Sequence, residues 1–172
     1  GLLTPGLCRQ VIDLATRAGK PVLVDPKRAD LAVYEGASLI SPNLKEMELV
    51  SGISVTNDDQ AETVCRKVLE QYQFGAIVLT RGAAGMSLVE RDVVPAFHIG
   101  SQAKSVYDVS GAADTGIATI TGGLASSLVL RAVVALANAA TGLVVGNPGL
   151  GVVPWREVRA GFDNVSNPHV ST

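Results

Sequence analysis

The chain has 172 residues, of which 47% are hydrophobic and 17% charged, and its net charge is −2 at pH 7. A length of this order predicts one domain, and the apolar content is ample for a core, so a disordered chain is disfavoured. No basic patch stands out, which argues against a nucleic-acid partner. Neither a signal-peptide pattern before Pro5 nor an apolar run of membrane-spanning length occurs, so we expect a soluble, cytoplasmic protein.

The first hundred residues alternate between helix and strand patterns. Predicted helices begin at three cap-like positions, at Thr4 before Pro5, at Asn43 and at Thr56. Predicted strands occupy five short apolar runs, at 21–25, 37–40, 76–80, 86–90 and 93–99. The first three read as buried parallel strands, whereas the tight turn at 81–85 makes the later ones antiparallel edge strands. We therefore expect a three-layer α/β domain with a mainly parallel sheet.

Several polar residues near the predicted strand ends allow two interpretations. Asp25 and Lys27 follow a strand at the edge where open α/β sheets place their sites, but they also fit a solvated turn. Asn43 and Glu46 fit a capping box at a helix start. The turn at 81–85 is either a plain hairpin or a backbone loop against a nucleotide phosphate, with Thr80 and Gly82 contributing.

The second half is organised around a stretch of small residues at 107–118. The apolar run from Thr115 to about 128 predicts a helix, so Gly111 to Asp114 would form a loop entering a helix N-terminus. Free backbone N–H groups and the helix dipole favour phosphate there. An aspartate would repel an anion, so Asp114 is better interpreted as a base or as the partner of a cation. The alternative, that Ser110 or Asp114 simply caps the helix, stays open.

A second helix is predicted at 130–145, apolar nearly all round and therefore buried. Asn138 is its polar exception, and it either hydrogen-bonds neighbouring backbone or contacts an adenine ring. Cys8 and Cys65 lie far apart and are expected as buried thiols in a reducing compartment. His98 and His169 are isolated, so a zinc site has little support.

The residues 108–115, DVSGAADT, resemble the C-terminal signature D-[TV]-[TS]-G-A-G-D-[TS] of ribokinase-like (PfkB) sugar kinases. This resemblance implies that Asp114 is the catalytic base and that Gly111, Ala112 and Ala113 form the anion hole for the transferred phosphoryl group. The family has glycine where this chain has Ala113. If that position needs a positive φ or very close phosphate contact, alanine would strain or obstruct the hole.

Further motifs are similar to those of bacterial heptose 7-phosphate kinases within this family. They lie at 21–27, 41–46, 79–86, 102–110 and 137–142. The resemblance implies ATP and Mg²⁺ as cofactors, with a monovalent cation as a further candidate. The implied nucleotide contacts are Thr80, Gly82, Gly85, Asn138 and Gly142. The implied substrate contacts are Lys27 and Asp108, and Asn43 and Glu46 would hold Mg²⁺ through water.

The resemblance thus implies a ribokinase-like fold, with 1–163 as the C-terminal part of a sugar-kinase domain and 164–172 as a tail. The implied function is ATP-dependent phosphorylation of a sugar, a heptose 7-phosphate of the lipopolysaccharide core ADP-heptose pathway. A truncated or degenerate nucleotide-binding module without catalysis is the alternative. A sheet lacking several family strands would expose an edge and apolar surface, so we expect a homo-oligomer or a part of a longer chain. A Rossmann dehydrogenase is disfavoured, because 82–85 does not fit its glycine pattern.

Overall fold

The computed structural model describes residues 3–102, 111–146, 154 and 156–159. It forms two compact units, one of residues 1–82 and 87–98, the other of 83–86 and 99–172. The helices of the first unit are α1 (Pro5–Arg17), α2 (Leu44–Ser51) and α3 (Asp58–Gln71), with a short 3₁₀ turn at Leu31–Tyr34. A second 3₁₀ turn, Gly82–Ala84, begins in the first unit and ends in the second. The strands are β1 (Leu23–Val24), β2 (Leu39–Ile40), β3 (Ala76–Thr80), β4 (Met86–Glu90) and β5 (Phe97–Ile99).

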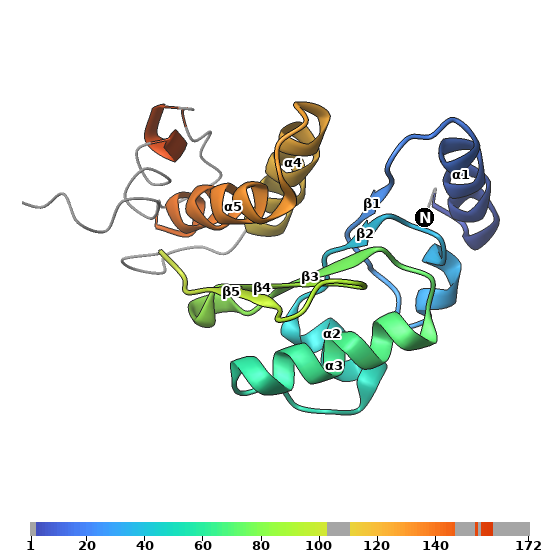
Figure 1. The fold of residues 1–172 in the computed structure, drawn as a ribbon, viewed down its shortest axis with the longest axis horizontal. Helices are drawn as coiled ribbons and strands as arrows, with labels where there is room; N and C mark the ends of the chain where they lie inside the picture. Colours follow the sequence, from blue (N-terminus) through green and yellow to red (C-terminus); the bar gives the residue numbers. More distant parts are fainter. Residues whose placement is uncertain (1–2, 103–110, 147–153, 155, 160–172) are drawn as a thin grey trace, which may run out of the picture. The chain divides into compact units, whose positions relative to one another are not determined.

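The five strands form one sheet in the order β1-β2-β3-β4-β5 (Figure 1). β1, β2 and β3 are parallel, with Leu23 beside Leu39 and Ile40 beside Ile77. β4 follows β3 after only five residues, a connection too short for a parallel crossover, so this pair is antiparallel. The predicted α/β fold, with a mainly parallel sheet and an antiparallel edge, is confirmed.

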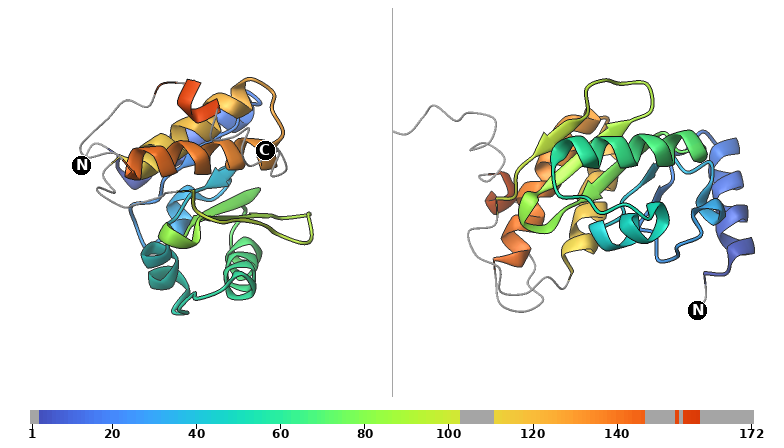
Figure 2. Two further views of the ribbon diagram at one scale, coloured as in Figure 1. Left: turned by 90° about the vertical axis from the view of Figure 1, so that its left-hand side faces the viewer. Right: turned by 90° about the horizontal axis from the view of Figure 1, so that it is seen from below.

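The helices α2 and α3 cover the same face of this sheet, as both views in Figure 2 show. The apolar stripe of α3 packs on the central strands because Val64 and Val68 recur at helical spacing while Ile77 and Leu79 fill the facing positions. All four side chains are at most 2% exposed. Cys65 belongs to this core, and burial raises the pKa of its thiol to about 12, so it stays protonated. Cys8 is also a free thiol but only half-buried, so the expectation of two buried thiols holds for Cys65 alone.

The first helix begins as its sequence predicts, with the Thr4 hydroxyl accepting the Leu7 N–H at 3.3 Å and Pro5 opening the helix. Its apolar residues, however, divide between two sides. Ile12 is buried, whereas Val11 and Leu14 are 50% and 63% exposed. Helix α1 therefore has exposed apolar side chains of its own, while the expectation of apolar surface left open by missing strands stays a prediction.

The second unit contains a helical hairpin of α4 (Ala112–Ala125) and α5 (Leu130–Val145). The helices approach closely where α4 has glycine. A Cβ on Gly116 would lie 3.2 Å from Thr141 Cγ2, and one on Gly123 would lie 2.7 Å from both γ-methyls of Val133. The later glycine of α4 meets the earlier residue of α5, so the two helices are antiparallel. The close approach needs residues without side chains on α4.

Strands β1 and β2 are shorter than the predicted runs at 21–25 and 37–40, and the predicted starts of α4 and β5 were wrong. Helix α4 begins at Ala112, three residues before the predicted start, because Gly111 takes the left-handed conformation that precedes it. Strand β5 begins at Phe97 rather than at residue 93, because the residues before it form a turn that is bonded to α3. The bounds of α5 agree with the predicted helix at 130–145.

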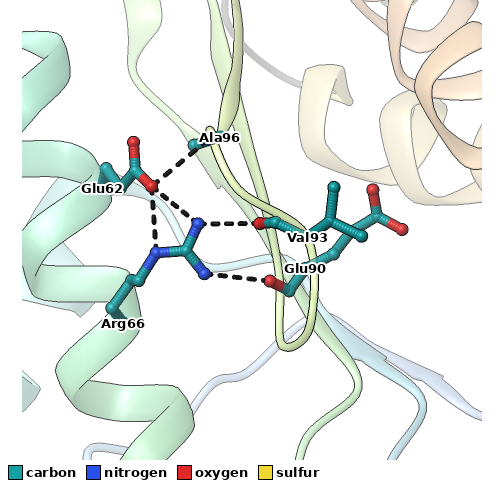
Figure 3. Close-up of polar contacts among 5 residues, drawn as sticks. All are labelled: Glu62, Arg66, Glu90, Val93 and Ala96. Atoms are coloured by element: carbon teal, nitrogen blue, oxygen red, sulfur yellow. Dashed lines mark hydrogen bonds and ion pairs between the residues drawn. The ribbon is translucent and has the colours of Figure 1, made fainter.

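That turn is held by two side chains of α3, Glu62 and Arg66 (Figure 3). The Arg66 guanidinium donates to the carbonyls of Glu90 at 3.1 Å and Val93 at 2.8 Å, and to Glu62 Oε1 at 2.6 Å. The same carboxylate oxygen accepts the Ala96 N–H at 3.3 Å. The hydrogen bond from Arg66 lowers the pKa of the Glu62 carboxyl below its ordinary value. The backbone of 90–96 is thus bonded to a helix, which leaves little of it for strand pairing.

No helix in the described ranges is long and apolar enough to cross a membrane.

Candidate functional site

The N-terminus of α4 carries the features that a phosphate site requires. Gly111 precedes the helix with φ 76° and ψ −3°, and no side chain among the described residues caps this end. The first helical hydrogen bond runs from the Thr115 N–H to the Gly111 carbonyl at 2.9 Å. The N–H groups of Ala112, Ala113 and Asp114 precede that bond, so the helix gives them no acceptor. Three donors and the positive end of the helix dipole thus meet at one place.

Asp114 stands in the first turn of α4 with an exposed side chain. Its carboxylate accepts no helix N–H as a cap, so the interpretation of Asp114 as a plain capping residue is wrong. Ser110, the other candidate cap, and Asp108 lie outside the described residues. An exposed carboxylate beside free amides can accept a proton from a hydroxyl group that is brought to the same place.

Ala113 occupies a helical position and is exposed. Among the described residues, Ser127 is the one non-glycine residue with a positive φ, so Ala113 needs no conformation reserved for glycine. The left-handed conformation falls on Gly111, which is glycine in this chain as in the family signature. Backbone strain at Ala113 is therefore excluded as an obstacle.

A second group of polar residues lies in the first unit, at the carboxyl ends of β1 and β2. Lys27 Nζ is 2.8 Å from Asp25 Oδ2 and 3.8 Å from Glu46 Oε1. Asp25 is singled out in the sequence only by its place at a strand end, and the structure adds its ion pair with Lys27. The Lys27 side chain is 65% exposed, so these ion pairs are worth little to stability and the ammonium can turn to a ligand.

Glu46 and Asn43 form a full capping box at the start of α2. The Asn43 side-chain oxygen accepts the Glu46 N–H at 3.0 Å, and Glu46 Oε2 accepts the Asn43 N–H at 2.9 Å. Thr80, the last residue of β3, pairs with Asn43 through a parallel bridge and donates its N–H to the Pro42 carbonyl at 2.9 Å. The capping box therefore fixes the side chains of Asn43 and Glu46 at the edge of the sheet where β3 ends.

The two glycines of the turn after β3 have different surroundings. Both have positive φ, 57° at Gly82 and 84° at Gly85. A Cβ on Gly82 would meet nothing within 4 Å, so another molecule can approach its backbone. A Cβ on Gly85 would lie 2.6 Å from Gly100 C and Ser101 N, so Gly85 is needed for packing within the second unit.

Asn138 and Gly142, the other predicted nucleotide contacts, lie in α5. Asn138 is 3% exposed and its Nδ2 donates to the Gly100 carbonyl at 2.8 Å. The hydrogen bond to neighbouring backbone, one of its two interpretations, is therefore present, while a contact with adenine stays a prediction. Gly142 is half-buried and accepts the Gly146 N–H.

One ion pair at the turn after β3 was missed in the sequence analysis. Arg81 stands between Thr80 and Gly82, its side chain is 5% exposed, and its Nη1 lies 2.6 Å from Asp58 Oδ1 at the start of α3. This ion pair joins the end of β3 to the first turn of a helix. The sequence signals an acidic first turn at 58–59, but nothing in it pairs that turn with an arginine more than twenty residues away.

Each unit by itself offers groups that suit a part of a nucleotide with its magnesium. In the second unit the amides at the start of α4 suit phosphate oxygens, and in the first unit the open backbone at Gly82 does so. Glu46 Oε1 is not used by the capping box, and carboxylate and amide oxygens are suitable magnesium partners, directly or through water. Within the described residues there is no group of three or more His, Cys, Asp or Glu that could hold a metal alone. Magnesium commonly completes its shell with waters and substrate phosphates.

These features define an α/β protein of the ribokinase type, and solved structures agree. Phosphofructokinase-2 from Escherichia coli, solved with potassium, matches with a TM-score of 0.83 at 18% identity, over 96% of this chain and 54% of that one. Ribokinase from Arabidopsis thaliana, complexed with ribose and ATP, matches with a TM-score of 0.81 at 20% identity, over 92% of this chain and 53% of that one.

The family model described as pfkB family carbohydrate kinase matches residues 3–156. The chain belongs to this family. The bifunctional protein HldE of Halorhodospira halophila is 45% identical over 150 residues, which are 87% of this chain and 31% of the relative. That of Granulibacter bethesdensis is 38% identical over 177 residues, with 100% of this chain and 36% of the relative covered. The chain thus spans about a third of the length of these curated relatives.

Proposed function

We propose that this chain supplies the nucleotide-binding part of an ATP-dependent sugar kinase whose substrate is a heptose 7-phosphate. The observation that carries the proposal is the start of α4, where free amides, a left-handed Gly111 and the exposed Asp114 carboxylate lie within four residues. Membership of the pfkB family supports phosphoryl transfer to a sugar. The heptose rests on the motifs shared with heptose 7-phosphate kinases and on the HldE relatives.

In this proposal Asp114 accepts the proton of the sugar hydroxyl as its oxygen attacks the γ-phosphorus of ATP. The bond from that phosphorus to the bridging oxygen breaks, and ADP leaves with the electron pair. The N–H groups of Ala112 and Ala113, with Gly111, donate to the phosphoryl oxygens that carry the developing charge. Such donors are already oriented, so they stabilise the transition state without reorganisation.

The residues at the strand ends take the supporting roles. Bound Mg²⁺ would neutralise phosphate charge, with Asn43 and Glu46 as its partners through water. Thr80, Gly82, Gly85 and Gly142 are proposed to contact the nucleotide. Lys27 and Asp108 are proposed to hold the sugar phosphate. A monovalent cation is a further candidate, as one neighbouring kinase was solved with potassium.

The exposed apolar face of α1 supports a further part of the proposal. Leu7, Val11 and Leu14 are 36%, 50% and 63% exposed and recur along one side of the helix. Apolar stripes of this kind mark surfaces that another polypeptide covers. We propose that the chain acts as a homo-oligomer or within a longer chain. We also propose that it acts in the cytoplasm, where its substrate ATP is present.

The test measures phosphoryl transfer from ATP to the sugar after the remainder of a kinase domain has been added to the chain. It compares the rate of the wild-type chain with that of Asp114→Asn. The substitution removes the base but keeps the shape, so turnover should fall about 10²- to 10⁴-fold. ATP affinity should hold or rise, because a negative charge is removed beside the phosphates. Asp92→Asn, an exposed carboxylate in the β4–β5 turn, is the matched control and should change neither quantity.

Undiminished turnover in Asp114→Asn would refute the role of this residue. ATP binding by the wild-type chain without any transfer to a sugar would instead favour the second candidate, a non-catalytic nucleotide-binding module. The departure at Ala113 from the glycine of the family signature motivates that candidate.

A further inference from the structure

Asn138 holds the backbone that follows β5. Its side chain is 3% exposed in the middle of α5, and its Nδ2 donates to the Gly100 carbonyl at 2.8 Å. Gly100 itself is exposed, and a Cβ there would meet nothing within 4 Å. A buried amide group is thus bonded to an exposed point of the main chain. The bond fixes that point because a buried amide that lost its partner would be left unsatisfied.

The same stretch of backbone is also held from the other side. Gly85 has φ 84°, and a Cβ there would collide with the backbone of Ile99, Gly100 and Ser101. The main chain at 99–101 therefore runs directly against the glycine that ends the turn after β3. Asn138 and Gly85 together leave Gly100 little freedom to move.

These contacts continue to the helix that carries Asp114. A Cβ on Gly116, two residues after Asp114, would lie 3.2 Å from Thr141 Cγ2 and 3.9 Å from Met86 Cε. Met86 follows Gly85, and Thr141 lies one turn after Asn138 and donates its hydroxyl to the Asn138 carbonyl at 3.0 Å. The end of the turn, the residues after β5 and both helices thus meet within the second unit.

We propose that Asn138 is a positioning residue, which fixes Gly100 and, through the backbone at 99–101, fixes Gly85, a proposed nucleotide contact at the end of the turn after β3. The hydrogen bond fills one amide donor and the side chain is buried, so Asn138 acts on the backbone rather than on the base of a nucleotide. The catalytic part of this inference rests on the proposed function, whereas the anchoring of Gly100 does not.

The first test is amide hydrogen exchange of the peptide covering 97–102 in the folded chain. Asn138→Leu keeps the size of the side chain and removes the donor, so exchange in this peptide should rise several-fold. Thr141→Val is the matched control, because it removes a hydrogen bond on the same helix but keeps the methyl group against Gly116, and exchange at 97–102 should not change. If Asn138→Leu does not fold, Asn138→Ser takes its place. Unchanged exchange in a folded variant would overturn the proposal.

The second test separates positioning from contact with the base. A positioning role predicts that ATP and GTP affinities fall by the same factor in Asn138→Leu and stay unchanged in Thr141→Val. A selective loss of ATP affinity relative to GTP would overturn the proposal in favour of an adenine contact. If the wild-type chain binds no nucleotide, the proposed function fails while the exchange experiment still decides the anchoring.

Discussion

Two adjacent glycines in α4 should respond in opposite directions to the same substitution. Gly122 is exposed and a Cβ there meets nothing within 4 Å, so Gly122→Ala gains helix propensity, about 0.5–1 kcal/mol. At Gly123 a Cβ would lie 2.7 Å from both γ-methyls of Val133, which is fully buried. A valine in a helix has one favoured rotamer, so it cannot turn away. Overpacking of this kind costs about 1–3 kcal/mol, which exceeds the gain in propensity.

The assay is thermal and urea unfolding of the two single variants. Since 1 kcal/mol shifts the Tm of a chain of this size by about 2–4 °C, Gly122→Ala should raise the Tm by a few degrees and Gly123→Ala should lower it. Adding Val133→Ala to Gly123→Ala makes room for the new methyl group, so the two substitutions should couple favourably in a double-mutant cycle. A rise in Tm for both alanine variants, or additive behaviour in the cycle, would refute the close packing of α4 on α5.

Four other substitutions test the remaining contacts. Glu62→Gln weakens the bonds to its arginine partner and should cost about 1 kcal/mol of unfolding free energy at pH 7, with Glu70→Gln as a silent control on the same helix. Because folding lowers the pKa of Glu62, its contribution to stability is present above the unfolded pKa and disappears as the pH falls through the folded pKa. A difference in unfolding free energy between wild type and Glu62→Gln that persists in acid would contradict this assignment. Gly85→Ala should prevent stable folding, because the new Cβ would collide with backbone atoms. Gly82→Ala should fold, with an unfolding free energy lower by about 1–2 kcal/mol and with weaker ATP binding. Equal soluble yields of the two variants would be inconsistent with the structure. Asn43→Ala breaks the capping box and should lower stability by about 1 kcal/mol in urea titrations, so an unchanged midpoint would count against it.

Elements whose signals are local could be predicted from the sequence. The caps of α2, with Asn43 before it and Gly52 in a left-handed conformation after it, are local, and so is the apolar run that defines α5. The start of α4 could not be predicted, because Gly111 is compatible with both a loop and a helix cap until its φ is known. The short β5 depends on bonds from Arg66 to carbonyls more than twenty residues away, which no local pattern contains.

The candidate site follows the same division. Asp114 and Gly111 could be named as candidates because the small residues, the aspartate and the resemblance to the family signature all lie within one short stretch. The ion pair of Asp58 with Arg81 and the bond of Asn138 to Gly100 join residues 23 and 38 positions apart, so only the fold brings them together. Asn138 illustrates this most clearly, since its burial was predicted but its partner could not be.

The central claim, that the start of α4 binds nucleotide phosphate, is tested most directly by calorimetric titration of ATP, with and without Mg²⁺, into the wild-type chain, Ala113→Asp and Ala113→Asn. An aspartate in the first turn favours the helix, so the variant should be at least as stable as the wild type. The added charge beside bound phosphate should weaken ATP more than about tenfold, while the neutral asparagine changes affinity far less. Equal ATP affinity in all three folded proteins would contradict the claim, because the phosphates would then bind elsewhere.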